Sequence, residues 1–116
     1  MNTNEAVRPR RFAIKRRGEI TWLGRSEPCL IFNISRTGMF IICNYDWLAT
    51  GTMVDVSLEL EPGSKFACKM EIRYADDGCC GGLIVDADPE STIHLDNFIR
   101  ANFSHQEHLP ERRKTR

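Results

Sequence analysis

The chain has 116 residues, a length that suits one domain and leaves no room for a second hydrophobic core. Hydrophobic residues make up 41% of it, close to the value for globular proteins, so a packed fold is expected. Sixteen basic and sixteen acidic residues give a formal net charge of zero, which argues against a general nucleic-acid binder.

The zero net charge conceals an uneven distribution. Residues 1–36 carry eight basic and three acidic groups, residues 37–100 carry four basic and eleven acidic groups, and residues 101–116 carry four basic and two acidic groups. A cationic amino-terminal segment suggests a local anionic partner. The acidic body would repel a nucleic-acid duplex, so DNA and RNA are not expected as partners.

Several features place the chain in a reducing compartment without a membrane span. No apolar run reaches the length of about 18 residues that a membrane helix needs, and the basic start is not followed by an apolar stretch as in a signal peptide. Five cysteines cannot all pair, and Cys29, Cys43 and Cys68 lie in apolar, strand-like runs. A cytoplasmic location without membrane insertion is therefore expected. Cys79 and Cys80 lack the spacing of a zinc site, and no metal is expected.

Residues 1–17 are expected to form a flexible basic arm. Within ten positions this segment contains six cations: Arg8, Arg10, Arg11, Lys15, Arg16 and Arg17. Arginine forks bind phosphate oxygens, or the O6 and N7 atoms of guanine, in a bidentate way. The alternative is a solvated, frayed terminus, which is the usual state of a basic chain end.

Six short runs downstream of the arm predict β-strands. They cover residues 19–23, 29–34, 39–43, 52–60, 66–74 and 82–85. Period-two alternation is clearest in the fifth run, where it predicts one buried face made of Phe66, Cys68, Met70, Ile72 and Tyr74. Short, closely spaced strands of this kind predict a small antiparallel barrel or sandwich.

Between the second and third runs lies the segment Asn33-Ile34-Ser35-Arg36-Thr37-Gly38. Asn, Ser and Gly are ordinary turn residues, so the segment can be a simple hairpin connection. Alternatively, the Asn33 amide and the Ser35 hydroxyl present hydrogen-bonding groups at a barrel mouth, where Gly38 lets a ligand approach the backbone.

One helix is predicted after the last strand. Asp88 can cap it and Pro89 suits its first turn. An apolar stripe then follows helical spacing and is expected to cover an open end or face of the barrel; it consists of Leu95, Phe98, Ile99 and Phe103. The barrel and helix together are assigned to residues 18–104, and residues 105–116 are expected to be a disordered tail.

In this order, the basic arm, the Asn33–Gly38 turn, the short strands and the terminal helix resemble the PilZ domain family. That family is marked by an RxxxR arm and a [D/N]xSxxG motif, and the second motif is matched by Asn33, Ser35 and Gly38. The resemblance extends from about Arg10 to Phe103. It implies a six-stranded antiparallel PilZ-like β-barrel with a C-terminal α-helix, which binds the bacterial second messenger cyclic di-GMP and relays the signal to a partner protein.

The resemblance also implies a set of ligand-binding residues in the arm and in the turn. The set consists of Arg10, Arg11, Lys15, Arg16, Asn33, Ser35 and Gly38. In this interpretation Arg10 and Arg11 hold guanine edges and phosphates, and the turn supplies the opposing surface.

The RxxxR motif is incomplete in this chain. Four residues after Arg10 stands Ile14, four after Arg11 stands Lys15, and Arg16 is one place further on. A lysine can meet a phosphate as a point charge but cannot make the bidentate guanine contact. The alternative function is therefore a degenerate PilZ-like module that does not bind the nucleotide and acts through protein contacts. The segment Tyr45–Leu48 is a candidate contact loop for such a module; alternatively, Trp47 is a buried core or lid residue.

Enzymatic activity is not expected. His94 falls on the predicted helix and the other two histidines fall in the tail, so the barrel region has no histidine. The carboxylates alternate outward along the strands, so no acid–base pair stands out. No P-loop or dinucleotide-binding glycine motif is present, and no cofactor beyond the ligand cyclic di-GMP is expected.

Overall fold

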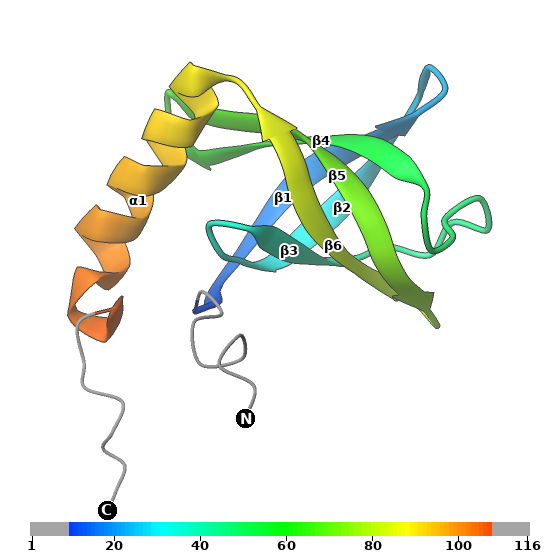
Figure 1. Ribbon diagram of the computed structural model, residues 1–116, viewed down its shortest axis with the longest axis horizontal. Helices are drawn as coiled ribbons and strands as arrows, with labels where there is room; N and C mark the ends of the chain where they lie inside the picture. Colours follow the sequence, from blue (N-terminus) through cyan, green and yellow to red (C-terminus); the bar gives the residue numbers. More distant parts are fainter. Residues whose placement is uncertain (1–9, 108–116) are drawn as a thin grey trace, which may run out of the picture.

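A computed structural model describes residues 10–107 of the chain, and Figure 1 shows a barrel of strands with one long helix beside it. The elements are β1 (Phe12–Trp22), β2 (Arg25–Ile34), β3 (Gly38–Ile42), β4 (Met53–Glu61), β5 (Ser64–Asp76), β6 (Cys79–Ala87) and α1 (Pro89–Glu107). Neighbouring strands pair antiparallel in the order β1-β2-β3-β6-β5-β4, and β4 pairs with β1 to close the barrel. The predicted six-stranded antiparallel barrel with a C-terminal helix is confirmed.

The barrel interior is filled by the side chains that alternate inward along the strands. From β4 and β5 these are Val54, Val56, Leu58, Leu60, Phe66, Cys68, Met70 and Ile72, all of them buried. The other half of the barrel contributes Ile20, Ile31 and Ile41, among other buried residues. Closure pairs both edges of each described strand, and buried apolar side chains fill the interior, so a binding site is expected on the outer surface of the barrel.

Strand β1 begins earlier than the sequence predicted. The prediction of a flexible arm through residue 17 is wrong for residues 12–17, which belong to β1 and pair with β2 on both sides of a bulge. Phe12 and Ile14 point inward and are buried, while the cations beside them face solvent. The density of charge masked this alternation, because only two apolar residues carry it. Residues 1–9 of the predicted arm lie outside the described part of the chain.

Helix α1 has the predicted start and a later end. The Ser91 amide donates to Asp88 Oδ1 over 2.7 Å, which confirms Asp88 as the cap. The predicted stripe packs on the barrel end, where Phe98 is buried and the Phe103 ring stacks on Phe12 with centroids 4.6 Å apart. The helix continues to Glu107, so residues 105–107 are helical and not part of a disordered tail. Residues 108–116 of that predicted tail lie outside the described residues.

Tyr74 does not join the buried face predicted for the fifth run. Its side chain is 45% exposed, because the register of β5 against β6 shifts between Ile72 and Tyr74. Two residues of β5 there oppose one step of β6, which is a β-bulge, and the alternation reverses beyond it. Similar shifts interrupt the β1–β2 pairing between Ala13 and Arg16 and the β2–β3 pairing at Phe32.

Cys68 and Cys80 are buried in the barrel core, where they pack as small apolar side chains. Burial raises the pKa of Cys68 to about 12, so its thiol stays protonated at neutral pH. Cys80 is fully buried on β6. No helix within residues 10–107 combines the length and the apolar character that crossing a membrane requires.

Candidate ligand-binding site

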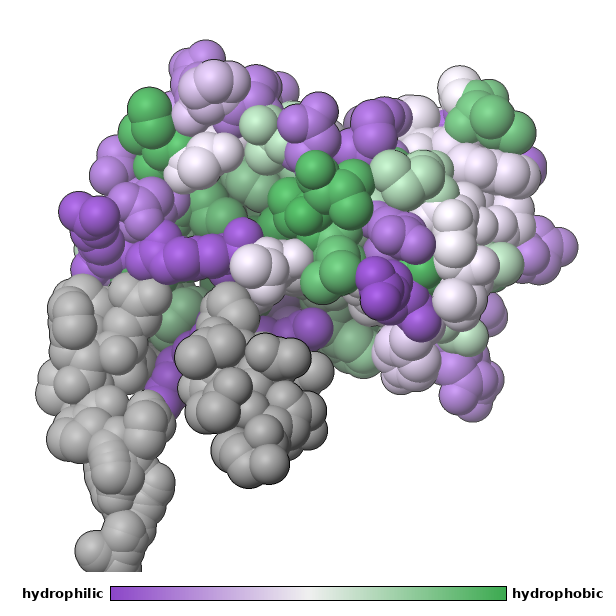
Figure 2. All heavy atoms as spheres, in the orientation of Figure 1, coloured by the Kyte–Doolittle hydropathy of each residue, from purple (hydrophilic) through white to green (hydrophobic). Residues whose placement is uncertain are grey.

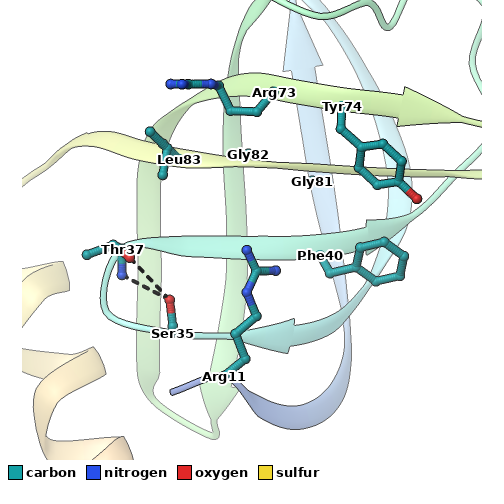
Figure 3. A pocket seen from close by; sticks show the side chains of 9 residues that line it. All are labelled: Arg11, Ser35, Thr37, Phe40, Arg73, Tyr74, Gly81, Gly82 and Leu83. Atoms are coloured by element: carbon teal, nitrogen blue, oxygen red, sulfur yellow. Dashed lines mark hydrogen bonds between the residues drawn. The ribbon is translucent and has the colours of Figure 1, made fainter. Parts of the chain in front are cut away.

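A pocket of about 410 Å³ opens on the outer surface of the barrel, above β3, β6 and β5. Its lining consists of Arg11, Ser35, Thr37, Phe40, Arg73, Tyr74, Gly81, Gly82 and Leu83, which Figure 3 shows as sticks. The volume falls in the range of small-molecule sites, which is about 300–1,000 Å³. Figure 2 shows apolar side chains at the centre of this face, where β6 crosses it, with hydrophilic side chains around them. Leu83 and Val85 are among the exposed apolar side chains of that strand.

The turn between β2 and β3 forms one wall of the pocket. Its Ser35 is 2% exposed, and Ser35 Oγ accepts the amides of Thr37 and Gly38, each over 3.1 Å. The Ser35 amide in turn donates to the Gly38 carbonyl over 2.8 Å. The hydroxyl therefore holds the turn in shape by satisfying buried amides, which fixes where the neighbouring side chains stand. Ser35 is a positioning residue as well as a lining one.

Two glycines bring the strands below the pocket close together. A Cβ on Gly38 would lie 2.5 Å from the Gly82 carbonyl oxygen and 3.7 Å from Arg11 Nη2. A Cβ on Gly82 would lie 2.3 Å from the Glu71 carbonyl oxygen. Any side chain at either position would force the backbones apart, since Cβ atoms do not approach carbonyl oxygens so closely. Together with Gly81, these residues leave a floor of bare backbone.

Arg11 connects the basic segment with the turn. Its Nη1 donates to Asn33 Oδ1 over 3.4 Å, and its guanidinium extends along the pocket toward β3 (Figure 3). Of the predicted site residues, the structure thus brings together Arg11, Asn33, Ser35 and Gly38. Arg11 and Ser35 line the cavity itself, whereas Asn33 and Gly38 are not part of its lining.

The other three predicted cations do not line this pocket. Arg10 is exposed at the start of the described chain. Lys15 occupies the bulge of β1 with a φ of 55°, and its Nζ lies 5.7 Å from the centre of the Phe32 ring. Arg16 turns toward the helix end of the barrel: its Nε donates to the Leu60 carbonyl over 2.9 Å, and its Nη1 donates to the Ile14 carbonyl over 2.7 Å.

An aromatic band, made of Phe32, Phe40 and Tyr74, crosses the outer face of the barrel. The Phe40 and Tyr74 rings are stacked, with centroids 6.3 Å apart and planes 18° apart, and Phe32 meets Phe40 edge-on at 6.2 Å. Gly81 of β6 is the register partner of both Phe40 and Tyr74, so the rings meet over a position without a side chain. None of the three belongs to the barrel core. The band therefore offers ring surface to the outside.

Two of the pocket's polar groups were missed at the level of sequence. Arg73 lines the pocket opposite Arg11, and its Nη1 lies 3.8 Å from Glu71 Oε1. The Tyr74 hydroxyl lies 3.3 Å from Cys79 Sγ, and this hydrogen bond raises the pKa of Tyr74, so the phenol stays neutral. Both residues come from the bulge of β5, which strict alternation cannot predict.

An ion-pair chain ties the turn to the helix. Arg36, between Ser35 and Thr37, pairs with Asp96 of α1, and Asp96 Oδ2 also lies 2.9 Å from Arg100 Nη2. An ion pair thus links the turn that forms the pocket wall to the helix. Within residues 10–107, no group of three or more His, Cys, Asp or Glu side chains is arranged to hold a metal ion.

Comparison with known proteins finds a matching family model and solved structures with a similar fold. The family model described as the PilZ domain matches residues 5–101. A PilZ domain of CeSA from a cellulose-synthesizing bacterium aligns with a TM-score of 0.64 at 15% identity, covering 84% of this chain and 98% of that one. The search of curated proteins gave no match.

Two longer proteins contain the same fold. The Bacillus subtilis inhibitor of motility aligns with a TM-score of 0.63 at 15% identity, over 81% of this chain and 49% of that one. The Borreliella burgdorferi PlzA protein, whose structure is a complex with c-di-GMP, aligns with a TM-score of 0.59 at 14% identity, over 77% and 39%. This chain therefore spans half or less of these two proteins.

Proposed function

Because this chain belongs to the PilZ domain family, a family of cyclic di-GMP-binding modules, we propose that it binds cyclic di-GMP in the pocket above β3, β5 and β6. PilZ domains are regulatory binding modules, and the proposed role is that of a receptor which passes the signal to a partner protein. Enzymatic activity forms no part of the proposal.

The observation that carries the proposal is the meeting of the two motif segments at one cavity. Arg11, from the basic segment, is bonded to Asn33 of the turn, and the pocket lies beside this contact. A dinucleotide with two phosphates needs cations and hydrogen-bond donors on one side and apolar surface for its bases on the other. Arg11 and Arg73 supply the first, and the aromatic band supplies the second.

Calorimetric titration of the full chain with cyclic di-GMP tests the proposal. Binding heat is expected for the wild type. Arg11→Ala and Ser35→Ala are each expected to weaken binding by about 1 kcal/mol or more, because the first removes a charge-assisted bond and the second removes the support of the turn. Arg25→Ala serves as the control, since Arg25 is exposed and pairs with Glu27 away from the pocket. Absence of heat, and of any NMR chemical-shift change at high micromolar ligand, would refute the proposal.

The second candidate is a PilZ module that acts only through protein contacts. The observation that favours it is the engagement of Arg16 with two backbone carbonyls, which leaves the arm short of the second arginine of the family pattern. The loop proposed for such contacts is partly buried: the Trp47 ring is stacked between Trp22 and Tyr45, with centroids 5.3 and 5.6 Å away. A chain that binds a stoichiometric protein partner equally well with and without cyclic di-GMP would support this candidate over the first.

A further inference from the structure

The second guanidinium of the pocket comes from β5 and not from the amino-terminal segment. Lys15 is engaged with the Phe32 ring, and Arg16 is bonded to the carbonyls of Leu60 and Ile14. Arg73 lines the pocket across from Arg11, so the cavity has two arginines although the RxxxR motif has only one in register. In Figure 3, Arg11 extends toward β3 from one side of the pocket, and Arg73 lies on the other side with its guanidinium directed toward the Leu83 end.

The bulge of β5 aims Arg73 and Tyr74 at the same cavity. Consecutive residues of a regular strand point to opposite faces of the sheet. Here Ile72 pairs with Gly82 and Tyr74 with Gly81, so Arg73 is the extra residue. Ile72 points into the core, while Arg73 and Tyr74 are both exposed and both line the pocket. Bulges that redirect side chains are frequent beside binding sites.

The surroundings of Arg73 favour a base edge over a phosphate. Glu71 Oε1 lies 3.8 Å from Arg73 Nη1 and offsets part of the positive charge, which weakens attraction for an anion. A neutral pair of acceptors remains a good partner for the planar fork. The stacked rings of Phe40 and Tyr74 lie at the other end of the same pocket and supply the stacking surface that a base needs. The hydrogen bond to Cys79 Sγ holds the Tyr74 ring in place.

We infer that Arg73 is a specificity-determining residue that reads the O6 and N7 edge of a guanine stacked against Tyr74 and Phe40. This inference rests on the proposed binding of cyclic di-GMP and adds to it the residue that distinguishes guanine from adenine. Adenine carries an amino donor in place of O6, so it cannot accept both bonds of the fork. Arg73 thereby supplies, from another strand, the second bidentate contact that Lys15 cannot make.

The test measures the affinities for cyclic di-GMP and cyclic di-AMP in parallel, on the full chain. Arg73→Lys keeps the charge and removes the fork; it is expected to weaken cyclic di-GMP binding about tenfold and to leave cyclic di-AMP binding within about twofold. Tyr74→Leu removes the ring and is expected to weaken both nucleotides by about tenfold, because stacking does not depend on the identity of the base. Circular dichroism and thermal unfolding verify that each variant is folded.

Arg25→Lys is the matched control. Arg25 is also an exposed strand arginine with a glutamate two residues away, and its Nε lies 3.5 Å from Glu27 Oε2. It is expected to keep both wild-type affinities. If Arg73→Lys binds cyclic di-GMP as the wild type does, or loses both nucleotides equally, Arg73 does not read the base and the inference is overturned. In that case loss of binding in Arg11→Ala still upholds the proposed function, whereas a wild type that binds neither nucleotide overturns both.

Discussion

Gly82 lines the pocket and also lies where β5 and β6 approach each other most closely, so replacing it tests the packing of these two strands. The residue lies on β6, between Met39 of β3 and Ile72 of β5. In Gly82→Ala the new Cβ would stand 2.3 Å from the Glu71 carbonyl oxygen and 3.0 Å from the Met70 Cγ. The carbonyl belongs to a paired strand, so relief requires a shift of β5 against β6.

The expected loss follows from this overlap. Inserting a methyl group into a filled site typically costs about 1–3 kcal/mol. Here the obstacle is backbone, and displacing it also weakens ladder hydrogen bonds worth about 1 kcal/mol each. A loss of about 3 kcal/mol in the free energy of unfolding is therefore expected, which lowers the thermal midpoint of a domain of this size by about 12–24 °C.

The neighbouring glycine provides the control. A Cβ on Gly81 would meet the Tyr74 Cδ2 at 3.4 Å, the Met39 carbonyl oxygen at 3.6 Å and the Phe40 Cδ1 at 3.8 Å, which are ordinary contacts. Gly81→Ala is thus expected to stay within about 0.5 kcal/mol of the wild type. Urea unfolding followed by the fluorescence of Trp22 and Trp47 measures both variants. Equal stability of Gly82→Ala and the wild type, or equal losses in the two variants, would refute the close approach of β5 and β6.

Three further expectations concern other parts of the chain. Asp88→Ala is expected to lower the free energy of unfolding by about 1 kcal/mol through loss of the helix cap, whereas Asp88→Asn keeps the acceptor; urea unfolding that finds the two variants alike would contradict the cap. Leu23→Asn is expected to raise the free energy of unfolding by about 0.5–1 kcal/mol. Leu23 is 83% exposed and has a φ of 51° in the two-residue turn between β1 and β2, a conformation that asparagine adopts more readily than leucine. An unchanged thermal midpoint would count against this expectation. At pH 8, iodoacetamide is expected to modify Cys43 before Cys68. The hydrogen bond from Cys80 lowers the pKa of Cys43, whereas burial raises the pKa of Cys68. Equal modification rates of the two cysteines, measured by peptide mass spectrometry after timed quenching, would contradict this expectation.

The regular part of the fold could be predicted because alternation reports burial directly. Each inward position of β4 carries an apolar residue and each outward one a polar or charged residue, apart from the ends. The helix was predictable for the same reason, since Asp88 and the apolar stripe are local signals. The start of β1 was not, because Phe12 and Ile14 are flanked on both sides by cations whose charge suggested a solvated arm.

In the candidate site, too, some residues could be predicted from local sequence signals and others could not. Arg11, Asn33, Ser35 and Gly38 belong to contiguous motifs, and the structure brings them together. The contribution of Arg73 depends on a register shift that no neighbouring residue signals, and the place of Tyr74 depends on the same shift. A bulge arises from the pairing of two strands, so it is absent from any reading of one strand by itself.

The bulges explain how a filled barrel acquires a binding surface at all. An interior packed with side chains forces regular alternation, and regular alternation leaves only every second residue outside. The irregular pairings at Lys15, Phe32 and Arg73 each add one residue to a strand, and each of these residues contributes to the aromatic band, its cations or the pocket. The core keeps its register on either side of them, as the buried Ile31 and Ile72 show. The outer face can thus gather rings and cations at a density that a regular strand could not provide, without loss of the packing that holds the barrel closed.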